Sequence, residues 1–385
     1  MLIKLASYGL LIALLPLTMV WVSDNPDKYR KLVWITLFLT FDLIMFGAFT
    51  RLTDSGLGCP DWPGCYSRST PIEAHADISA AERADPHGPV TVFKAWIEMI
   101  HRYFAIGIGV LITALMLIAW HRWIKSRGRN RKFLPAFPTA LFVFVCLQGA
   151  FGAWTVTMLL HPFIVTTHLM LGMALLALLT WLGARQTDHP PVEPSAATLR
   201  IPVVVALALL VTLIALGGWV SSNYAAWACP DLPLCVGSAF PSMDFSNGFT
   251  LWRNLHMTAD GKPIPHEALV AIHWTHRVGA IIVAVYITWV ALRALNTKGL
   301  QRTAYWLLSV TALQFTAGVS LVLLHWPLLL AVAHNGGAAL LLFLITMLAY
   351  KVYCARHETG ESMASPTHAT MGRRSPAPSR ELARE

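Results

Sequence analysis

The sequence is poor in charged residues. Asp, Glu, Lys and Arg make up only 13% of its 385 residues, against roughly 25% in a soluble domain. Hydrophobic residues account for 56%. This composition excludes an ordinary soluble globular domain and indicates an integral membrane protein.

Acidic residues are unevenly distributed, and this predicts the topology. The loop at 122–132 has six bases and no acid, and the tail from Lys351 onward is also basic. The acids gather in two long segments, 52–92 and 221–267. By the positive-inside rule, the basic segments lie in the cytoplasm and the two long loops lie outside. The net charge of +9 is therefore interpreted as a topology signal, and we expect no nucleic-acid partner.

Apolar runs long enough to cross about 30 Å of hydrocarbon recur along the chain. Since only helices and closed barrels span membranes, the expected fold is all-α. The nine runs are 4–22, 32–51, 97–120, 134–157, 163–184, 201–220, 268–292, 303–324 and 328–350.

The first of these runs has two interpretations. Lys4 and the apolar core resemble a signal peptide or signal-anchor. However, no A-x-A cleavage site follows, and the run is long enough to span. We therefore expect a retained extra helix within residues 1–25. The chain also lacks the Arg- and Ser-rich leader of an organellar protein.

Cysteine is scarce, and four of the six cysteines form two matched motifs. Cys59 and Cys65 enclose Pro-Asp-Trp-Pro-Gly, and Cys229 and Cys235 enclose Pro-Asp-Leu-Pro-Leu. Both motifs fall in the predicted external loops, where disulfides form. A zinc site is the alternative, although zinc usually takes closer Cys spacing and four ligands. We predict the disulfides Cys59–Cys65 and Cys229–Cys235, with a structural or a redox role left open.

The two halves of the chain repeat each other. Residues 43–47 match 213–217 at an offset of 170, which the two Cys motifs share. His101-Arg102 matches His276-Arg277 at 175. Gln148, Gly152 and His168 match their second-half counterparts at 166.

This repeat predicts two pseudo-symmetric four-helix bundles with the same orientation. The expected organisation is an extra helix at 1–25, a first half at 26–190, a second half at 191–355 and a disordered cytoplasmic tail at 356–385.

Four histidines lie within the predicted spans as two repeated pairs, His101 with His168 and His276 with His334. Ionisable residues at membrane depth indicate functional sites. Each pair sits one to two turns below the outer surface, on the second and fourth helices of its bundle. Two imidazoles on facing helices are what a haem iron requires. The alternative is a pair of hydrogen-bonded core histidines, which two repeated pairs at matched depth disfavour.

The repeat is broken at one position beside these histidines. Glu98 aligns with His273, and it lies one turn from His101 on the same helix face. A carboxyl group there is a candidate for proton relay, which would make the first pocket the reactive one. Alternatively, Glu98 pairs with Arg102 or Lys94. Arg102 and Arg277 are candidate anchors for haem propionates, or ion-pair partners inside the bundles.

Six other histidines fall at the outer interface or in the external loops, where we expect solvated or interfacial side chains. They are His75, His87, His161, His256, His266 and His325.

The chain resembles the heme A synthase family of respiratory membranes. The resemblance covers about residues 32–352 in order and rests on several motifs together. These are Thr53-Asp54-Ser55-Gly56-Leu57-Gly58-Cys59-Pro60-Asp61-Trp62-Pro63-Gly64-Cys65, Lys94-Ala95-Trp96-Ile97-Glu98-Met99-Ile100-His101-Arg102, His168, His276-Arg277 and His334. The run at 4–22 extends beyond the family's eight-helix pattern.

The resemblance implies a reaction and a set of bound groups. A methyl group at ring position eight of heme O is hydroxylated successively and loses water, which leaves the formyl group of heme A. His101 and His168 would hold this substrate, with Glu98 beside it as the catalytic residue. His276 and His334 would ligate the iron of a resident haem B.

The expected location is the bacterial cytoplasmic membrane, with both haem sites toward the periplasmic side. Membrane lipid surrounds the chain. Heme O synthase and a second copy of the chain are candidate partners, and the sequence does not identify the electron donor.

Three other functions compete with this one. A di-haem b-type electron-transfer cytochrome uses the same histidine pattern, but has no need of Glu98 and usually places its haems at two depths. A membrane thiol-disulfide oxidoreductase would use the Cys motifs and bind no haem. A transporter would suit parallel repeats, but no broken midplane helix is predicted.

Overall fold

The computed structural model describes residues 1–129 and 133–354. Within these ranges the chain is helical, without strands, and nine helices are long and apolar enough to cross a membrane. All nine expected runs are therefore confirmed as helices. The helices are α1 (Leu2–Val22), α2 (Lys28–Leu52), α3 (His75–Ala84), α4 (Val92–Lys125), α5 (Ala136–Thr157), α6 (Pro162–Gln186), η2 (Pro194–Leu199), α7 (Arg200–Ser222), η3 (Ala225–Ala228), α8 (Phe245–Gly248), α9 (His266–Leu295), α10 (Gln301–Leu323) and α11 (Leu328–Cys354).

Capping residues place two helix starts earlier than hydropathy does. The side chain of Asp27 accepts a hydrogen bond from the Arg30 N–H at 3.1 Å, which starts α2. Thr91 accepts from the Lys94 N–H at 3.2 Å, which starts α4. Because polar residues outside the apolar runs cap these ends, α2 begins before residue 32 and α4 begins before residue 97.

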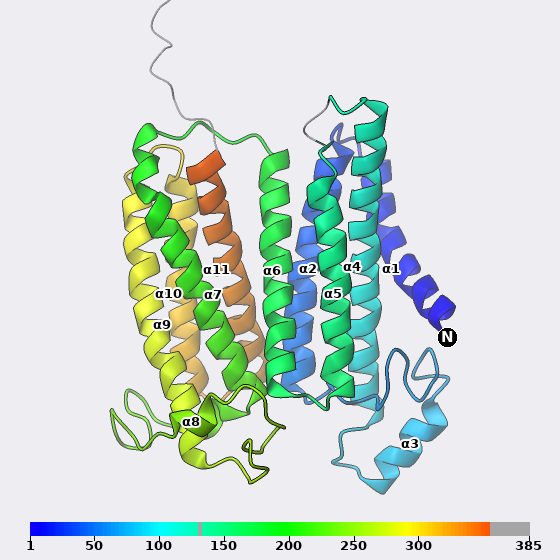
Figure 1. The fold of residues 1–385 in the computed structure, drawn as a ribbon, viewed down its shortest axis with the longest axis vertical. Helices are drawn as coiled ribbons and strands as arrows, with labels where there is room; N and C mark the ends of the chain where they lie inside the picture. Colours follow the sequence, from blue (N-terminus) through cyan, green and yellow to red (C-terminus); the bar gives the residue numbers. More distant parts are fainter. Residues whose placement is uncertain (130–132, 355–385) are drawn as a thin grey trace, which may run out of the picture.

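The spanning helices form two groups (Figure 1). In the first, α2 and α5 each pack against both α4 and α6. In the second, α7 and α10 each pack against both α9 and α11. The groups meet through α2 against α11, α6 against α7, and α6 against α11. Each contact of the first group thus has its counterpart in the second. The short helices α3 and α8 lie at the same end of the molecule, at the bottom of Figure 1, with α8 below the second group and α3 below the first.

Contacts at the junction of the groups join equivalent positions of the repeat. The Arg51 guanidinium donates to the Ser221 carbonyl at 2.7 Å, and the Tyr224 hydroxyl donates to the Asp54 carboxylate at 2.7 Å. Both pairs are separated by 170 residues, the offset of the repeat in this region. Equivalent residues touch each other only near a symmetry axis, so a pseudo-two-fold axis passes close to these four residues.

The extra helix α1 packs outside the first group, against α4 (Figure 1). A Cβ atom added to Gly9 would lie 2.2 Å from Cγ2 of Ile106, and one added to Gly107 would lie 3.0 Å from Cγ2 of Ile12. The Lys4 ammonium pairs with the Glu73 carboxylate at 2.7 Å, which ties the start of α1 to the external loop. Helix α1 is therefore packed against the rest of the protein, as the prediction of a retained extra helix requires. The predicted tail at 356–385 lies outside the described residues.

Candidate functional site

The four predicted ligands lie in matched turns of their helices. His101 and His276 lie in the third turn of α4 and α9, and His168 and His334 lie in the second turn of α6 and α11. All four helices enter from the end that carries the external loops. The first two histidines lie deeper along their helices than expected, because α4 and α9 begin earlier than hydropathy indicates.

The two helices that carry each pair have the same two neighbours. Both α4 and α6 pack against α2 and α5, and both α9 and α11 pack against α7 and α10. His168, His276 and His334 each have a buried Nδ1 atom with no protein partner. A buried polar atom usually has a hydrogen-bond partner. Neutral imidazoles with a free ring nitrogen are suitable ligands for iron, so the residues present fit a pair of haems.

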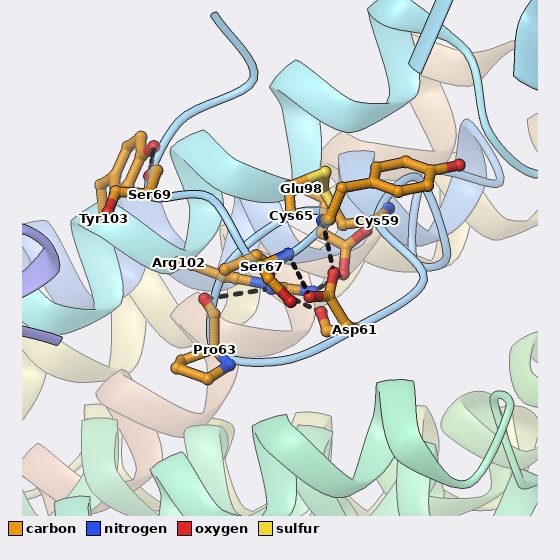
Figure 2. Close-up of a disulfide and its surroundings, with 11 residues drawn as sticks. Cys59, Asp61, Pro63, Cys65, Ser67, Ser69, Glu98, Arg102 and Tyr103 are labelled. Carbon is orange, nitrogen blue, oxygen red and sulfur yellow. Dashed lines mark hydrogen bonds and ion pairs between the residues drawn. A yellow bond between two sulfur atoms is a disulfide. The ribbon is translucent and has the colours of Figure 1, made fainter. Parts of the chain in front are cut away.

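The first Cys motif forms a closed loop held by its own aspartate. Cys59 and Cys65 are disulfide-bonded, as predicted. The two carboxylate oxygens of Asp61 accept the backbone N–H groups of Tyr66 and Ser67 at 2.7 and 2.6 Å. Figure 2 shows the Asp61 carboxylate directed at these groups from within the loop. The aspartate therefore fixes the turn that follows the second cysteine.

The second motif repeats this construction. Cys229 and Cys235 are disulfide-bonded, again as predicted. Asp231 accepts the N–H groups of Val236 and Gly237 at 2.7 and 2.8 Å. The Gly237 N–H, together with that of Val236, holds the pKa of Asp231 below its ordinary value. The carboxylate is therefore retained at neutral pH, and the loop loses this stabilisation only as the pH falls through the lowered pKa.

Each arginine that follows a predicted ligand is bonded to its Cys loop. Arg102 donates to the carbonyls of Asp61, Pro63 and Gly64 at 3.0, 3.2 and 2.6 Å, and it pairs with Glu98. Figure 2 shows its side chain extended beneath the loop.

The second half has equivalent hydrogen bonds between an arginine and its Cys loop. Arg277 donates to the carbonyls of Asp231 and Leu234 at 2.8 and 3.1 Å, and to that of Cys229. These hydrogen bonds fasten each disulfide loop to the helix that carries a histidine of the pair. Binding of a haem propionate by these arginines stays a prediction.

Glu98 is buried against the first loop. The residue is 4% exposed, and one carboxylate oxygen accepts the Cys59 N–H at 2.7 Å while the other pairs with Arg102. The expected alternative partner, Arg102, is therefore present. The equivalent His273 is 2% exposed and accepts a hydrogen bond from Nε of Arg277 at 3.3 Å. Both halves thus have the same contact between equivalent positions, with a carboxylate in one and an imidazole in the other.

The prediction for one of the outer histidines was wrong. His161 is only 4% exposed, it packs against the Trp252 ring at 4.6 Å between centroids, and neither ring nitrogen has a partner. Burial lowers the pKa of His161. The sequence did not indicate this, because the covering residue Trp252 comes from the external loop of the other half.

The chain matches one protein family and is similar to several named bacterial proteins. The model of the cytochrome oxidase assembly protein family, COX15-CtaA, matches residues 30–346. A heme A synthase of Shewanella oneidensis is 40% identical over 326 residues, which is 83% of this chain and 96% of the relative. A heme A synthase of Rhodopseudomonas palustris is 27% identical over 354 residues, 84% and 90% of the two chains. One of Sinorhizobium medicae is 28% identical over 339 residues, 83% and 88%.

Proposed function

Because the chain belongs to the COX15-CtaA family of cytochrome oxidase assembly proteins, we propose that it is a heme A synthase, an enzyme of heme A biosynthesis. Relatives that carry this name align with more than four fifths of the chain. The observation that carries the proposal is the repeated pair of half-buried histidines, each pair on two helices of one group. In each group, one disulfide loop is bonded to the arginine that follows the first histidine.

The proposed activity is an oxidoreductase reaction on heme O. The position-eight methyl group of this substrate is oxidised to a formyl group, which gives heme A. We place the substrate between His101 and His168. The asymmetry of the repeat supports this choice, since only this half has a carboxylic acid, Glu98, in the turn before the first ligand.

The second pair, His276 and His334, is proposed to hold a resident haem B. A haem held by these two histidines would supply an iron for the oxidative or electron-transfer chemistry. The protein contributes fixed imidazoles with a free buried nitrogen. It also contributes apolar helices around them, which exclude water from the pockets.

Each disulfide loop is proposed to close the outer end of one pocket. The positively charged Arg102 and Arg277 fix these loops to the ligand helices, by their bonds to loop carbonyls. The same charges favour a carboxylate nearby, so we retain both residues as propionate-binding candidates. In this arrangement the propionates face the outer side of the membrane.

Glu98 is proposed to handle protons at the substrate pocket. Its carboxyl group is buried and held by Arg102 and by the Cys59 N–H. A group fixed in this way has one position relative to His101 on the same helix. The equivalent His273 occupies the matching position beside the resident haem, where no reaction on the macrocycle is proposed.

The relatives are bacterial, and nine helices are suited to span a membrane. We therefore place this multi-pass protein in the bacterial cytoplasmic membrane, with its haem sites toward the periplasm. Heme O enters and heme A leaves. Heme O synthase and a second copy of the chain remain candidate partners.

The test is conversion in cells that supply heme O but lack their own heme A synthase. Expression of the chain should give heme A, identified by extraction and chromatography. His168→Ala should abolish heme A. Purified protein that holds only haem B, in cells that make no heme A, would support the di-haem electron-transfer cytochrome instead.

A further inference from the structure

The helices α5 and α10 have no predicted haem ligand, yet each makes two contacts with the histidine of the helix that follows it. A Cβ atom added to Gly152 would lie 3.1 Å from Cε1 of His168. One added to Gly318 would lie 3.2 Å from Cε1 of His334. In both cases the imidazole edge lies against bare backbone, and an added Cβ would make a contact tighter than ordinary van der Waals packing.

A glutamine one turn away on the same helix makes the second contact. Gln148 donates through Nε2 to the backbone carbonyl of His168 at 3.0 Å, and Gln314 donates to that of His334 at 3.0 Å. Both glutamines are half-buried. A backbone carbonyl within a helix already accepts the helical N–H bond, so these glutamine bonds are additional to helix formation. They join the ligand helix to its neighbour at the ligand itself.

The contacts are reciprocal between the paired helices. A Cβ atom on Gly172 would lie 3.3 Å from Nε2 of Gln148, and one on Gly337 would lie 2.1 Å from Oε1 of Gln314. The ligand helix therefore has a glycine that makes room for the glutamine, just as its neighbour has a glycine that makes room for the histidine. The arrangement occurs twice, in α5 with α6 and in α10 with α11.

The first histidine of each pair lies on a glycine as well. A Cβ atom on Gly47 of α2 would lie 3.1 Å from Nε2 of His101, and one on Gly217 of α7 would lie 3.0 Å from Cε1 of His276. No glutamine bond accompanies these two contacts among the interactions of the described residues. The double contact is thus specific to the second histidine of each pair.

We propose that Gln148 with Gly152, and Gln314 with Gly318, are positioning residues that fix the depth and ring orientation of the second axial histidine in each haem pocket. The glutamine fixes the height of the ligand backbone, and the glycine lets the imidazole lie flat against the neighbouring helix. Residues that orient a metal ligand typically change metal affinity or activity about 10–100-fold when they are mutated. This inference rests on the proposed haem binding but not on the reaction.

The test uses full-length protein expressed with haem B, and its readouts are retained haem and the low-spin ferric EPR signal. Gln314→Met keeps the side-chain length but removes the donor, so it should lower haem retention about tenfold. Gly318→Ala should shift the EPR signal, because the imidazole must rotate or retreat. Gly149→Ala is the matched control: it lies on α5, and nothing lies within 4 Å of its added Cβ.

The outcomes separate this inference from the proposed function. Wild-type protein without any low-spin haem signal would overturn the proposed function. Wild-type protein with the signal, together with Gly318→Ala and Gln314→Met that match Gly149→Ala, would overturn the positioning role. If Gly318→Ala does not fold, Gln314→Met is the deciding variant, because the methionine end replaces an amide that already lies 3.4 Å from Nε2 of His334.

Discussion

Position 98 shows how one residue distinguishes two otherwise similar halves. The carboxylate of Glu98 and the imidazole of His273 each contact the arginine one turn later, and each arginine holds a disulfide loop. Both residues therefore have the same structural role, which is to contact the arginine that holds the loop. What differs is a buried acid in one half only, which is the feature that a proton-handling role needs.

Replacing Glu98 by Gln separates these two roles. The amide retains an acceptor for the Cys59 N–H, so the loop should stay closed and heme O should stay bound, while heme A production should stall. Glu98→Ala should be the less stable variant, because removing one member of a buried ion pair costs about 3–5 kcal/mol. Bound haem, heme A yield and thermal unfolding measure these effects. His273→Gln is the matched control and should leave heme A production unchanged.

Two results would contradict this account of Glu98. Normal heme A production by Glu98→Gln would exclude a proton-handling role. Loss of bound heme O in the same variant would show that the residue acts through structure alone.

Side-chain direction is what the sequence predicted least well at this scale. Glu98 has three potential partners on its own helix, and helical spacing allows all of them. They are Lys94 four residues before it, His101 three residues after it and Arg102 four residues after it. The loop decides between them, because its Cys59 N–H and its carbonyls draw the carboxylate and the guanidinium together. A loop that folds back over a helix is a long-range contact, and sequence spacing contains no information on it. The burial of His161 under Trp252 has the same cause.

Elements were predicted much better than side chains. A bilayer requires every backbone polar group to be paired within a segment, so hydropathy alone located the nine helices. The starts of α2 and α4 were less accurate, because polar caps outside the apolar runs set them. The packing of α5 and α10 on the ligand histidines was present in the repeat as matched glutamines and glycines. However, only the three-dimensional contacts indicate that these glutamines and glycines position the histidines.

Helix α1 lies before the region that the family model matches. Its contact with α4 uses close backbone approach at Gly9 and Gly107, which is how membrane helices without polar pairs associate. The two groups proposed to bind haem consist of α2, α4 to α7 and α9 to α11. We therefore infer that α1 supports the fold without forming a pocket.

Gly9→Ala tests this assignment of α1. Its Cβ would meet Ile106 at 2.2 Å, so we expect a loss of about 1–3 kcal/mol from overpacking, although Ala is the better helix former. Haem content should not change. Thermal unfolding and the absorbance of bound haem measure both effects. Gly109→Ala on α4 adds a Cβ with nothing within 4 Å and should unfold like wild type; equal stability of the two variants would contradict the proposed packing.

At the scale of the whole molecule, the repeat appears as two groups of helices around a pseudo-two-fold axis. The bonds from Arg51 to Ser221 and from Tyr224 to Asp54 lie where the halves meet. Both histidine pairs lie toward the same end of the helices, so the two pockets are at matched depth. Such an arrangement allows electrons to pass laterally between two haems, and it differs from a chain of haems that carries charge across the membrane.

The central claim is that the two pockets are equivalent in construction but hold different haems. The most direct test is to extract and separate the haems of purified wild type, His168→Ala and His334→Ala from cells that make heme O. We predict haem B with heme O or heme A in wild type, loss of heme O and heme A alone in His168→Ala, and loss of haem B alone in His334→Ala. Haem B alone in wild type, or loss of the same haem from both variants, would contradict the account.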